Sequence, residues 1–242
     1  MRGTRKKIRY FFLGCLAALC SLLLSGDTSL PAGGGATVVL PDKPPMVAIT
    51  FDDGPIEATT TRLLDALALR EVQATFFLVG EFIPGNEALI TRMAADGHQI
   101  GVHSYSHIRI TDLSRSDFDL EVSKTRAQLQ EILGSRPFWL RPPYGLVDDS
   151  VQKWANSPII LWSVDPEDWK DRDSKRIVGE VLSRVRDGDI ILFHDIYESS
   201  VDAAIQVMDA LLQQGYYLCT VEQLLQAKNI PAENGHIYRR AG

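Results

Sequence analysis

Cysteine is scarce in this chain of 242 residues, which contains three cysteines in all. Two of them, Cys15 and Cys20, lie in a short apolar segment near the N-terminus, and the third is Cys219. A protein that loses the N-terminal segment keeps one cysteine and cannot form an internal disulfide. Its stability must then come from a packed core, so the composition excludes a disulfide scaffold.

An excess of basic charge is also missing once the first residues are set aside. The chain has 25 Lys and Arg against 31 Asp and Glu, and five of the basic residues precede the first acidic residue, Asp27. The 20 basic residues that remain are outnumbered by the acids. Phosphate backbones repel a protein of this charge, so we expect no nucleic-acid partner.

No apolar run reaches the roughly 20 residues that a membrane-spanning helix needs. Residues 10–24 are mostly apolar and uncharged, follow a basic stretch and precede Ser25 and Gly26. This order is typical of a secretory signal. We therefore assign residues 1–26 to a signal peptide or an N-terminal anchor, which predicts an exported protein, secreted or held at the outer face of the membrane. In either case membrane contact is confined to this segment.

Three further regions follow the N-terminal segment. Residues 27–45 contain four prolines and three glycines and no sustained apolar period, which predicts a linker. Residues 46–228 alternate short apolar runs with amphipathic stretches, and we assign them to one domain. Residues 229–242 are predicted to be a tail.

Seven apolar runs in the domain are predicted to be strands, at 47–51, 74–79, 99–102, 138–140, 159–164, 190–193 and 216–218. Helical periodicity occurs between them, at 59–69, 86–95, 116–133, 148–155, 174–186, 201–213 and 221–227. Ser116 and Ser174 are the expected N-caps of two of these helices. Alternating strands and helices imply parallel strands with helical crossovers. We predict a single α/β domain, a distorted (β/α) barrel of about seven parallel strands, with a doubly wound open sheet as the alternative.

Reactive side chains follow the carboxyl ends of five predicted strands. They are Asp52 and Asp53, His103 and His107, Arg141, Asp165 and Asp168, and His194 and Asp195. In parallel α/β folds the active site forms at this end of the sheet. We therefore expect these residues to share one cleft.

Two of these groups could hold a metal ion. His103 and His107 are four residues apart, although such a pair is more often found among ordinary loop residues. The Asp52-Asp53-Gly54 sequence is likewise more often a solvated turn. A carboxylate at the neighbouring strand end favours a metal, because two imidazoles and one carboxylate suit Zn²⁺ and leave positions for water and substrate. The same ligands also suit the Fe(II) of a non-haem oxygenase.

Five motifs occur in order along the chain: TFDDGP at 50–55, HSYSH at 103–107, RPPYG at 141–145, DPEDW at 165–169 and LFHD at 192–195. Together they resemble the polysaccharide deacetylase family, the NodB homology domain or carbohydrate esterase family 4, over about residues 46–225. Two departures are minor: Ile108 stands where proline is frequent, and Pro166 where a small polar residue is frequent. Neither removes a catalytic group.

The resemblance implies a metal site and a general base. Asp53, His103 and His107 would bind a divalent transition metal, with Zn²⁺ first and Co²⁺ or Ni²⁺ as alternatives. Asp52 would take a proton from water, and Arg141 would pair with Asp52 and keep it ionised.

The resemblance also implies a general acid and an acetyl pocket. His194 would protonate the leaving amine, and Asp168 would orient His194 and favour its charged form. The backbone amide of Tyr144 would help to stabilise the oxyanion. Trp169 and Leu192 would line the pocket for the acetyl methyl group, with Tyr144 beside them.

The implied activity is removal of N-acetyl groups from N-acetylglucosamine residues of a cell-surface polysaccharide, either peptidoglycan or a chitin-like oligosaccharide. Amide hydrolysis needs a nucleophile at neutral pH, a stabilised oxyanion and a proton for nitrogen, and the residues above could supply all three. The alternatives are an O-deacetylase of acetylated xylan and a non-catalytic carbohydrate-binding domain on the same fold. We expect a carbohydrate polymer as the partner and a monomeric protein.

Overall fold

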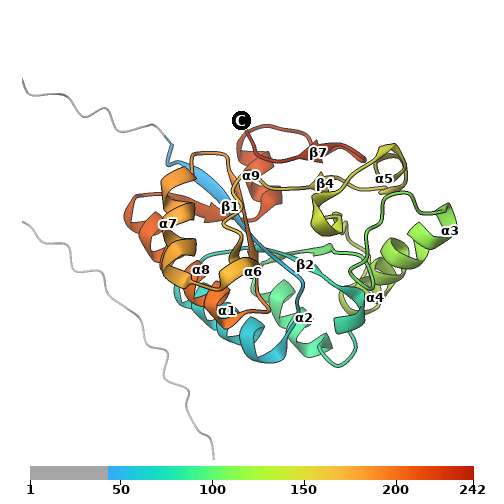
Figure 1. Ribbon diagram of the computed structural model, residues 1–242, viewed down its shortest axis with the longest axis horizontal. Coiled ribbons are helices and arrows are strands. Elements are labelled where there is room, and N and C mark those ends of the chain that lie inside the picture. The colour runs from blue at the N-terminus through green and yellow to red at the C-terminus, as the bar shows by residue number, and fades with distance from the viewer. Residues whose placement is uncertain (1–42) are drawn as a thin grey trace, which may run out of the picture. The chain divides into compact units, whose positions relative to one another are not determined.

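The computed structural model describes residues 43–242, which belong to one compact unit (Figure 1). The predicted signal or anchor at 1–26 and most of the predicted linker at 27–45 lie outside the described residues. Among residues 43–242, no helix is long and apolar enough to cross a membrane.

A parallel sheet forms the centre of the fold. Its strands are β1 (Met46–Asp52), β2 (Thr75–Leu78), β3 (Gln99–Val102), β5 (Ile190–His194) and β6 (Tyr217–Cys219). Their order is β3-β2-β1-β5, and β6 also pairs with β1. Residues 46–48 of β1 pair with β6 and residues 50–52 pair with β2, so these two strands share one edge of β1. Apolar residues fill both faces of β1, as expected for a strand that is covered on both sides.

Isolated bridges extend the sheet into a distorted barrel. Val102 at the end of β3 bridges Leu140, which in turn bridges Ile159 in β4 (Ile159–Ile160). Val164 bridges Ile191 in β5. These bridges are parallel and follow the chain order from β1 round to β5, so the predicted α/β class and barrel architecture are confirmed.

The predicted strand at 138–140 is reduced to the single bridge at Leu140. Pro142 and Pro143 follow Arg141 closely, and proline has no N–H to donate to a ladder. The predicted strand at 159–164 is similarly shortened to β4 and the bridge at Val164.

Helices lie outside the strands, with α1 and α7 on either side of α8 (Figure 1). The described helices are α1 (Glu57–Leu69), α2 (Glu87–Ala95), α3 (Arg115–Phe118), α4 (Lys124–Leu133), α5 (Asp149–Trp154), α6 (Asp168–Asp171), α7 (Ser174–Arg184), α8 (Glu198–Gln213) and α9 (Val221–Ala227). A π-helical turn, Asp119–Ser123, joins α3 to α4, and 3₁₀ turns form at Gly80–Phe82 and Pro143–Gly145.

The two predicted N-caps are wrong by one or two residues. Ser114, and not Ser116, accepts a hydrogen bond from the amide of Asp117 at the start of α3. Asp173, and not Ser174, caps α7 by accepting from the amides of the first turn. In each case an earlier residue already satisfies the free amides, so the predicted cap lies inside the helix.

Part of the predicted tail at 229–242 is a structural element. Strand β7 (Ile237–Tyr238) pairs in parallel with β4, and the ring of Tyr238 is buried. The amide of Ala241 donates a hydrogen bond of 2.7 Å to the carbonyl of Gly188. Because these residues cover the edge of β4, the segment packs with the barrel and does not extend from it.

Close packing at Gly101 in β3 leaves no room for a side chain. An ideal Cβ there would lie 2.5 Å from Cδ1 of Phe77 and 2.7 Å from the carbonyl oxygen of Trp139. This oxygen is held in place because it accepts a 2.8 Å hydrogen bond from the amide of Val102. We expect Gly101→Ala to lower the free energy of unfolding by about 1–3 kcal/mol, measured by urea denaturation.

Gly179 in α7 provides the matched control for this substitution. It is exposed, and no atom lies within 4 Å of an ideal Cβ there. Gly179→Ala should stabilise the protein by about 0.5–1 kcal/mol, because alanine loses less backbone entropy in a helix. Equal stability of Gly101→Ala and the wild type would contradict the close approach at β3.

Candidate active site

A pocket opens at the carboxyl ends of the strands. It is lined by Asp52, Asp53, His103, His107, Tyr144, Trp162, Asp165, Trp169, Leu192, His194 and Tyr197. Eight of these side chains are among the ten predicted site residues. The other two, Arg141 and Asp168, are fully buried and lie behind the pocket, in contact with Asp52 and His194. The parallel strands therefore bring together residues that are up to 142 positions apart in sequence, from Asp52 to His194.

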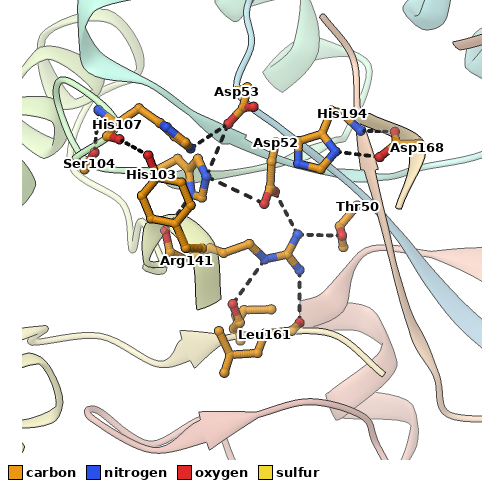
Figure 2. Close-up of polar contacts among 12 residues, drawn as sticks. Thr50, Asp52, Asp53, His103, Ser104, His107, Arg141, Leu161, Asp168 and His194 are labelled. Carbon is orange, nitrogen blue, oxygen red and sulfur yellow. Dashed lines mark hydrogen bonds and ion pairs between the residues drawn. The ribbon is translucent and has the colours of Figure 1, made fainter. Parts of the chain in front are cut away.

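Asp53, His103 and His107 meet at one side of this pocket. The Oδ1 atom of Asp53 lies 3.1 Å from Nε2 of His107 and 3.4 Å from Nε2 of His103. One ligand atom from each residue lies within 4.8 Å of the others, and Figure 2 shows the three side chains pointing toward one another. This spacing lets one ion contact all three atoms.

The hydrogen bonding of Asp53 and His103 leaves atoms of both side chains free to bind a metal ion. The Oδ1 atom of Asp53 is buried yet accepts no well-aligned hydrogen bond. Nδ1 of His103 lies 2.7 Å from the carbonyl oxygen of Arg141, which can only accept, so Nδ1 carries the proton and the lone pair of Nε2 faces the site. Two imidazole nitrogens and a carboxylate oxygen are suitable ligands for Zn²⁺, Co²⁺ or Ni²⁺.

Charge in this cluster favours a cation. Burial by itself would raise the pKa of the Asp53 carboxyl, but the imidazoles of His103 and His107 outweigh burial and hold the pKa below its usual range. Asp53 in turn raises the pKa of His107, against the effect of burial. The carboxylate is thus ionised and attracts positive charge, which a divalent ion would supply in place of protons on the imidazoles.

Backbone conformation explains how two consecutive aspartates face one pocket. Side chains alternate between the two faces of an extended strand, so neighbouring residues normally point apart. Asp52 is the last residue of β1, and Asp53 leaves the strand in the left-handed region, with φ of 75°. This turn brings the Asp53 carboxylate back toward the pocket that Asp52 already lines (Figure 2).

Asp52 is held by a buried arginine. Nη1 of Arg141 donates to Oδ1 of Asp52 at 2.8 Å and contacts the hydroxyl of Thr50 at 2.7 Å. The other guanidinium nitrogens donate to the carbonyl oxygens of Ile160 and Leu161, both at 3.1 Å (Figure 2). With its charge paired, Arg141 fixes the orientation of Asp52.

His194 and Asp168 form a second charge pair on the other side of the pocket. Nδ1 of His194 lies 2.7 Å from Oδ1 of Asp168, and the His194 amide donates to Oδ2 at 2.8 Å. Burial opposes the charged imidazolium, but Asp168, aided by the charges of Asp52 and Asp53, raises the pKa of His194 to about 9. The pair leaves Nε2 of a protonated imidazole available to the pocket.

Hydrophobic and aromatic groups form the remaining walls. Leu192 is buried and Trp169 is half exposed. The hydroxyl of Tyr144 donates to the carbonyl oxygen of His107 at 3.2 Å, and the two rings meet edge to face. Tyr144 has a left-handed backbone, with φ of 61°, which turns the chain sharply at the rim.

Trp162 and Tyr197 also line the pocket and were not predicted as site residues. Tyr197 stands three positions after His194, so its place just beyond a strand end was the available signal. Trp162 had no such signal, because it lies inside the run that was predicted as one continuous strand. Asp165 also lines the pocket, and its Oδ1 accepts from the amide of Glu167 at 2.8 Å.

Asp195 is a loop support outside the pocket lining. It is buried and accepts a hydrogen bond from the hydroxyl of Thr60. Its Oδ1 lies against Gly54, where an ideal Cβ would be 2.5 Å away. Burial raises the pKa of Asp195 to about 7. The side chain therefore packs under the loop that carries Asp52 and Asp53.

Fold and site together define a class of protein. Two imidazoles and one carboxylate that could hold a metal ion lie at the carboxyl end of a distorted (β/α) barrel. On one side is Asp52, paired with Arg141, and on the other is His194, paired with Asp168. Separate acid and base groups beside an open metal site are the arrangement of a metal-dependent hydrolase.

The chain belongs to the polysaccharide deacetylase family, whose model matches residues 40–158. The family that the five motifs predicted is therefore confirmed. A peptidoglycan-N-acetylglucosamine deacetylase of Bacillus cereus is 32% identical over 204 residues, which cover 81% of this chain and 95% of that protein. The peptidoglycan-N-acetylmuramic acid deacetylase PdaC of Bacillus subtilis is 42% identical over 183 residues, 76% of this chain.

The match with PdaC spans 39% of the length of that relative. A solved structure extends the comparison to another substrate class: a family 4 acetyl xylan esterase from Clostridium thermocellum in complex with a cobalt ion. It superposes with a TM-score of 0.77 and 30% identity, over 81% of this chain and 98% of that one.

Proposed function

We propose that this protein is a metal-dependent hydrolase that removes N-acetyl groups from N-acetylglucosamine residues of a cell-surface polysaccharide, with peptidoglycan as the leading substrate. One observation carries the proposal: the three candidate ligands converge beside two separately paired groups, Asp52 with Arg141 and His194 with Asp168. The first pair favours a base and the second an acid at the same pH, as amide hydrolysis requires.

In this proposal Asp53, His103 and His107 hold the metal. When bound, a divalent ion of this kind lowers the pKa of a coordinated water and polarises the substrate carbonyl. Asp52 takes a proton from the attacking water, and Arg141 holds Asp52 in place at the pocket. Zn²⁺ is the first candidate, with Co²⁺ and Ni²⁺ as alternatives, because all three suit these ligands.

His194 completes the proposed reaction. An amide anion is too poor a leaving group, so nitrogen must receive a proton as the C–N bond breaks. The raised pKa of His194 keeps its imidazole protonated at neutral pH, and Asp168 orients it. The amide of Tyr144 would donate to the oxyanion, while Trp169 and Leu192 would enclose the acetyl methyl group.

Peptidoglycan is favoured over xylan by the named activities of the two relatives, at 42% and 32% identity. Chitin-like oligosaccharides remain within the same N-acetylglucosamine class. The similarity to an acetyl xylan esterase keeps O-deacetylation as the second candidate, since the same groups could cleave an ester. The presence of a base, an acid and three ligands opposes a non-catalytic carbohydrate-binding role. We also propose that the protein is exported, because residues 1–26 have the order of a secretory signal, and that it acts outside the membrane. We further propose that it is a monomer.

The function is tested by acetate release from three substrates side by side: peptidoglycan, chitooligosaccharides and acetylated xylan. We expect release from the N-acetylated polymers, its loss after chelation, and its return when Zn²⁺ or Co²⁺ is added. Activity confined to xylan would replace the proposal by O-deacetylation. Activity that survives complete metal removal would overturn it.

Substitution of a ligand gives a second test. His103→Ala should weaken metal binding by more than about 100-fold and abolish acetate release, because one of three protein ligands is lost. Metal affinity is measured by competition with a chromophoric chelator. The matched control is His236→Ala, since His236 is exposed and does not line the pocket. If the His103→Ala protein bound metal as tightly as the control, the assigned ligand set would be wrong.

A further inference from the structure

A buried carboxylate that the proposed mechanism does not use holds the loop between the two histidines. Glu121 is 9% exposed, and its Oε2 accepts hydrogen bonds from the amides of Tyr105 at 3.0 Å and Ser106 at 2.9 Å. Its Oε1 accepts from the hydroxyl of Ser106 at 2.8 Å. One side chain thus anchors both amides in the middle of the HSYSH sequence, and the loop cannot move without breaking these bonds.

A π-helical turn aims Glu121 at this loop. The turn, Asp119–Ser123, inserts extra backbone between α3 and α4 and rotates the helix face that follows. Thr125, one turn further on, donates from its hydroxyl to the carbonyl oxygen of Ser104 at 3.0 Å. Turns of this type are found often at functional sites, where they redirect a side chain.

The carbonyl groups of the loop are fixed from the opposite side. The amides of Gly80 and Glu81 donate to the carbonyl oxygens of Ser104 and Tyr105, at 3.1 and 2.9 Å. An ideal Cβ at Gly80 would lie 2.3 Å from the Thr125 hydroxyl, so the two sides are in tight contact. Backbone from one side and Glu121 with Thr125 from the other clamp the loop.

The two histidines depend on this clamp to different degrees. His103 follows β3, its amide donates to the carbonyl of Leu78 at 2.8 Å, and its ring is fixed by Arg141. His107 lies at the far end of the loop with a left-handed backbone, φ of 56°, and its amide donates to the Ser104 hydroxyl at 2.9 Å (Figure 2). Its ring reaches Asp53 only if residues 104–106 keep this conformation.

The hydrogen-bond partners of the Glu121 carboxylate all lie in the loop between the two histidines. Within residues 43–242 it forms no salt bridge, and its two oxygens accept instead from two backbone amides and one hydroxyl. A buried carboxylate without a cation is costly, whereas charge-assisted bonds to amides hold a loop with high precision.

We propose that Glu121 is a positioning residue for the metal site: it places His107 opposite Asp53 by fixing the loop between the two histidines. The inference rests on the proposed function, since it concerns the same metal. Partners of metal ligands typically change metal affinity by about 10–100-fold when they are lost. The effect should fall on His107 and spare His103.

The test measures zinc dissociation constants of the purified protein by chelator competition, together with NMR signals of the histidine rings. Glu121→Ala should weaken zinc binding by about 10–100-fold, and the ring signals of His107 should broaden while those of His103 stay sharp. Glu121→Gln keeps an acceptor for the amides and can donate to the Ser106 hydroxyl, so it should bind zinc within about 3-fold of the wild type. Glu121→Asp, which is too short to reach both amides, should fall between the two and serves if the alanine variant does not fold.

Asp189→Ala is the matched control. Asp189 is also buried and accepts from a backbone amide, that of Arg186 at 2.7 Å, and from a serine hydroxyl, that of Ser163 at 2.9 Å. It lies just before β5, at the opposite end of that strand from His194. Asp189→Ala should lower the thermal midpoint and leave the zinc affinity unchanged.

Two results would overturn the inference. In the first, Glu121→Ala, or Glu121→Asp in its place, binds zinc as the wild type does while its thermal midpoint falls, which would make Glu121 merely structural. In the second, Glu121→Gln is as impaired as Glu121→Ala, which would exclude hydrogen-bond acceptance as the cause. A wild-type protein that binds none of zinc, cobalt and nickel would instead refute the proposed function.

Discussion

Replacing Asp52 with asparagine should lower kcat for deacetylation by about 10²–10⁴-fold and leave the metal bound. Asparagine keeps the shape of the side chain and can still accept the hydrogen bond from Nη1 of Arg141, which is 2.8 Å long in the wild type. It cannot take a proton from water at neutral pH. The measurement is acetate release at saturating metal, with metal content determined by mass spectrometry on the same sample.

Asp195→Asn is the control for loss of a nearby buried carboxylate. The pKa of Asp195 is raised to about 7, so asparagine resembles the neutral form that is already populated. Asp195 supports the same loop without lining the pocket, and we expect a loss of less than about 10-fold. Near-normal turnover of Asp52→Asn would show that Asp52 is not the base. Loss of metal from Asp52→Asn would make it a ligand.

His194→Ala should cost a similar factor, about 10²–10⁴ in kcat, because the leaving nitrogen is no longer protonated. The loss should depend on the leaving group. An aryl acetate expels a stable phenolate and needs no acid, so His194→Ala should retain far more of its activity on this ester than on the N-acetylated sugar. Equal losses on both substrates would assign His194 to positioning and not to proton transfer.

The pH profile tests the partner of His194. The active form of a general acid is protonated, so activity is present below its pKa and is lost as pH rises through it. Asp168 contributes to the raised pKa of about 9, and a bound divalent cation would act in the opposite direction. We expect Asp168→Asn to move the alkaline limb of kcat/KM to lower pH. An unchanged limb would mean that another group sets it.

Much of the fold could be predicted because its strands are buried on both faces. The sequence from Val47 to Phe51 is apolar and precedes two aspartates, a local pattern that predicts both a strand and where it ends. Parallel topology then places all strand ends together, so reactive residues at these ends were expected to share a pocket. Six of the nine reactive residues predicted from strand ends line the described pocket.

The elements that could not be predicted depend on distant partners. Residues 237–238 have no strand signal of their own and become β7 because the edge of β4 offers unpaired hydrogen-bonding groups. Residues 138–140 are apolar, yet the prolines that follow limit pairing to Leu140. Glu121 lies inside a helical pattern, and nothing in that pattern marks it as the residue that anchors a loop 15 and 16 positions earlier.

The reactive groups of this protein and their places at strand ends could be read from the amino-acid order, because apolar runs and their boundaries are local properties. The approach of Oδ1 of Asp53 to two imidazole nitrogens, at 3.1 and 3.4 Å, arises only in the folded chain. That geometry depends on left-handed turns at Asp53 and His107, which the surrounding packing and hydrogen bonds impose on residues that rarely adopt them alone.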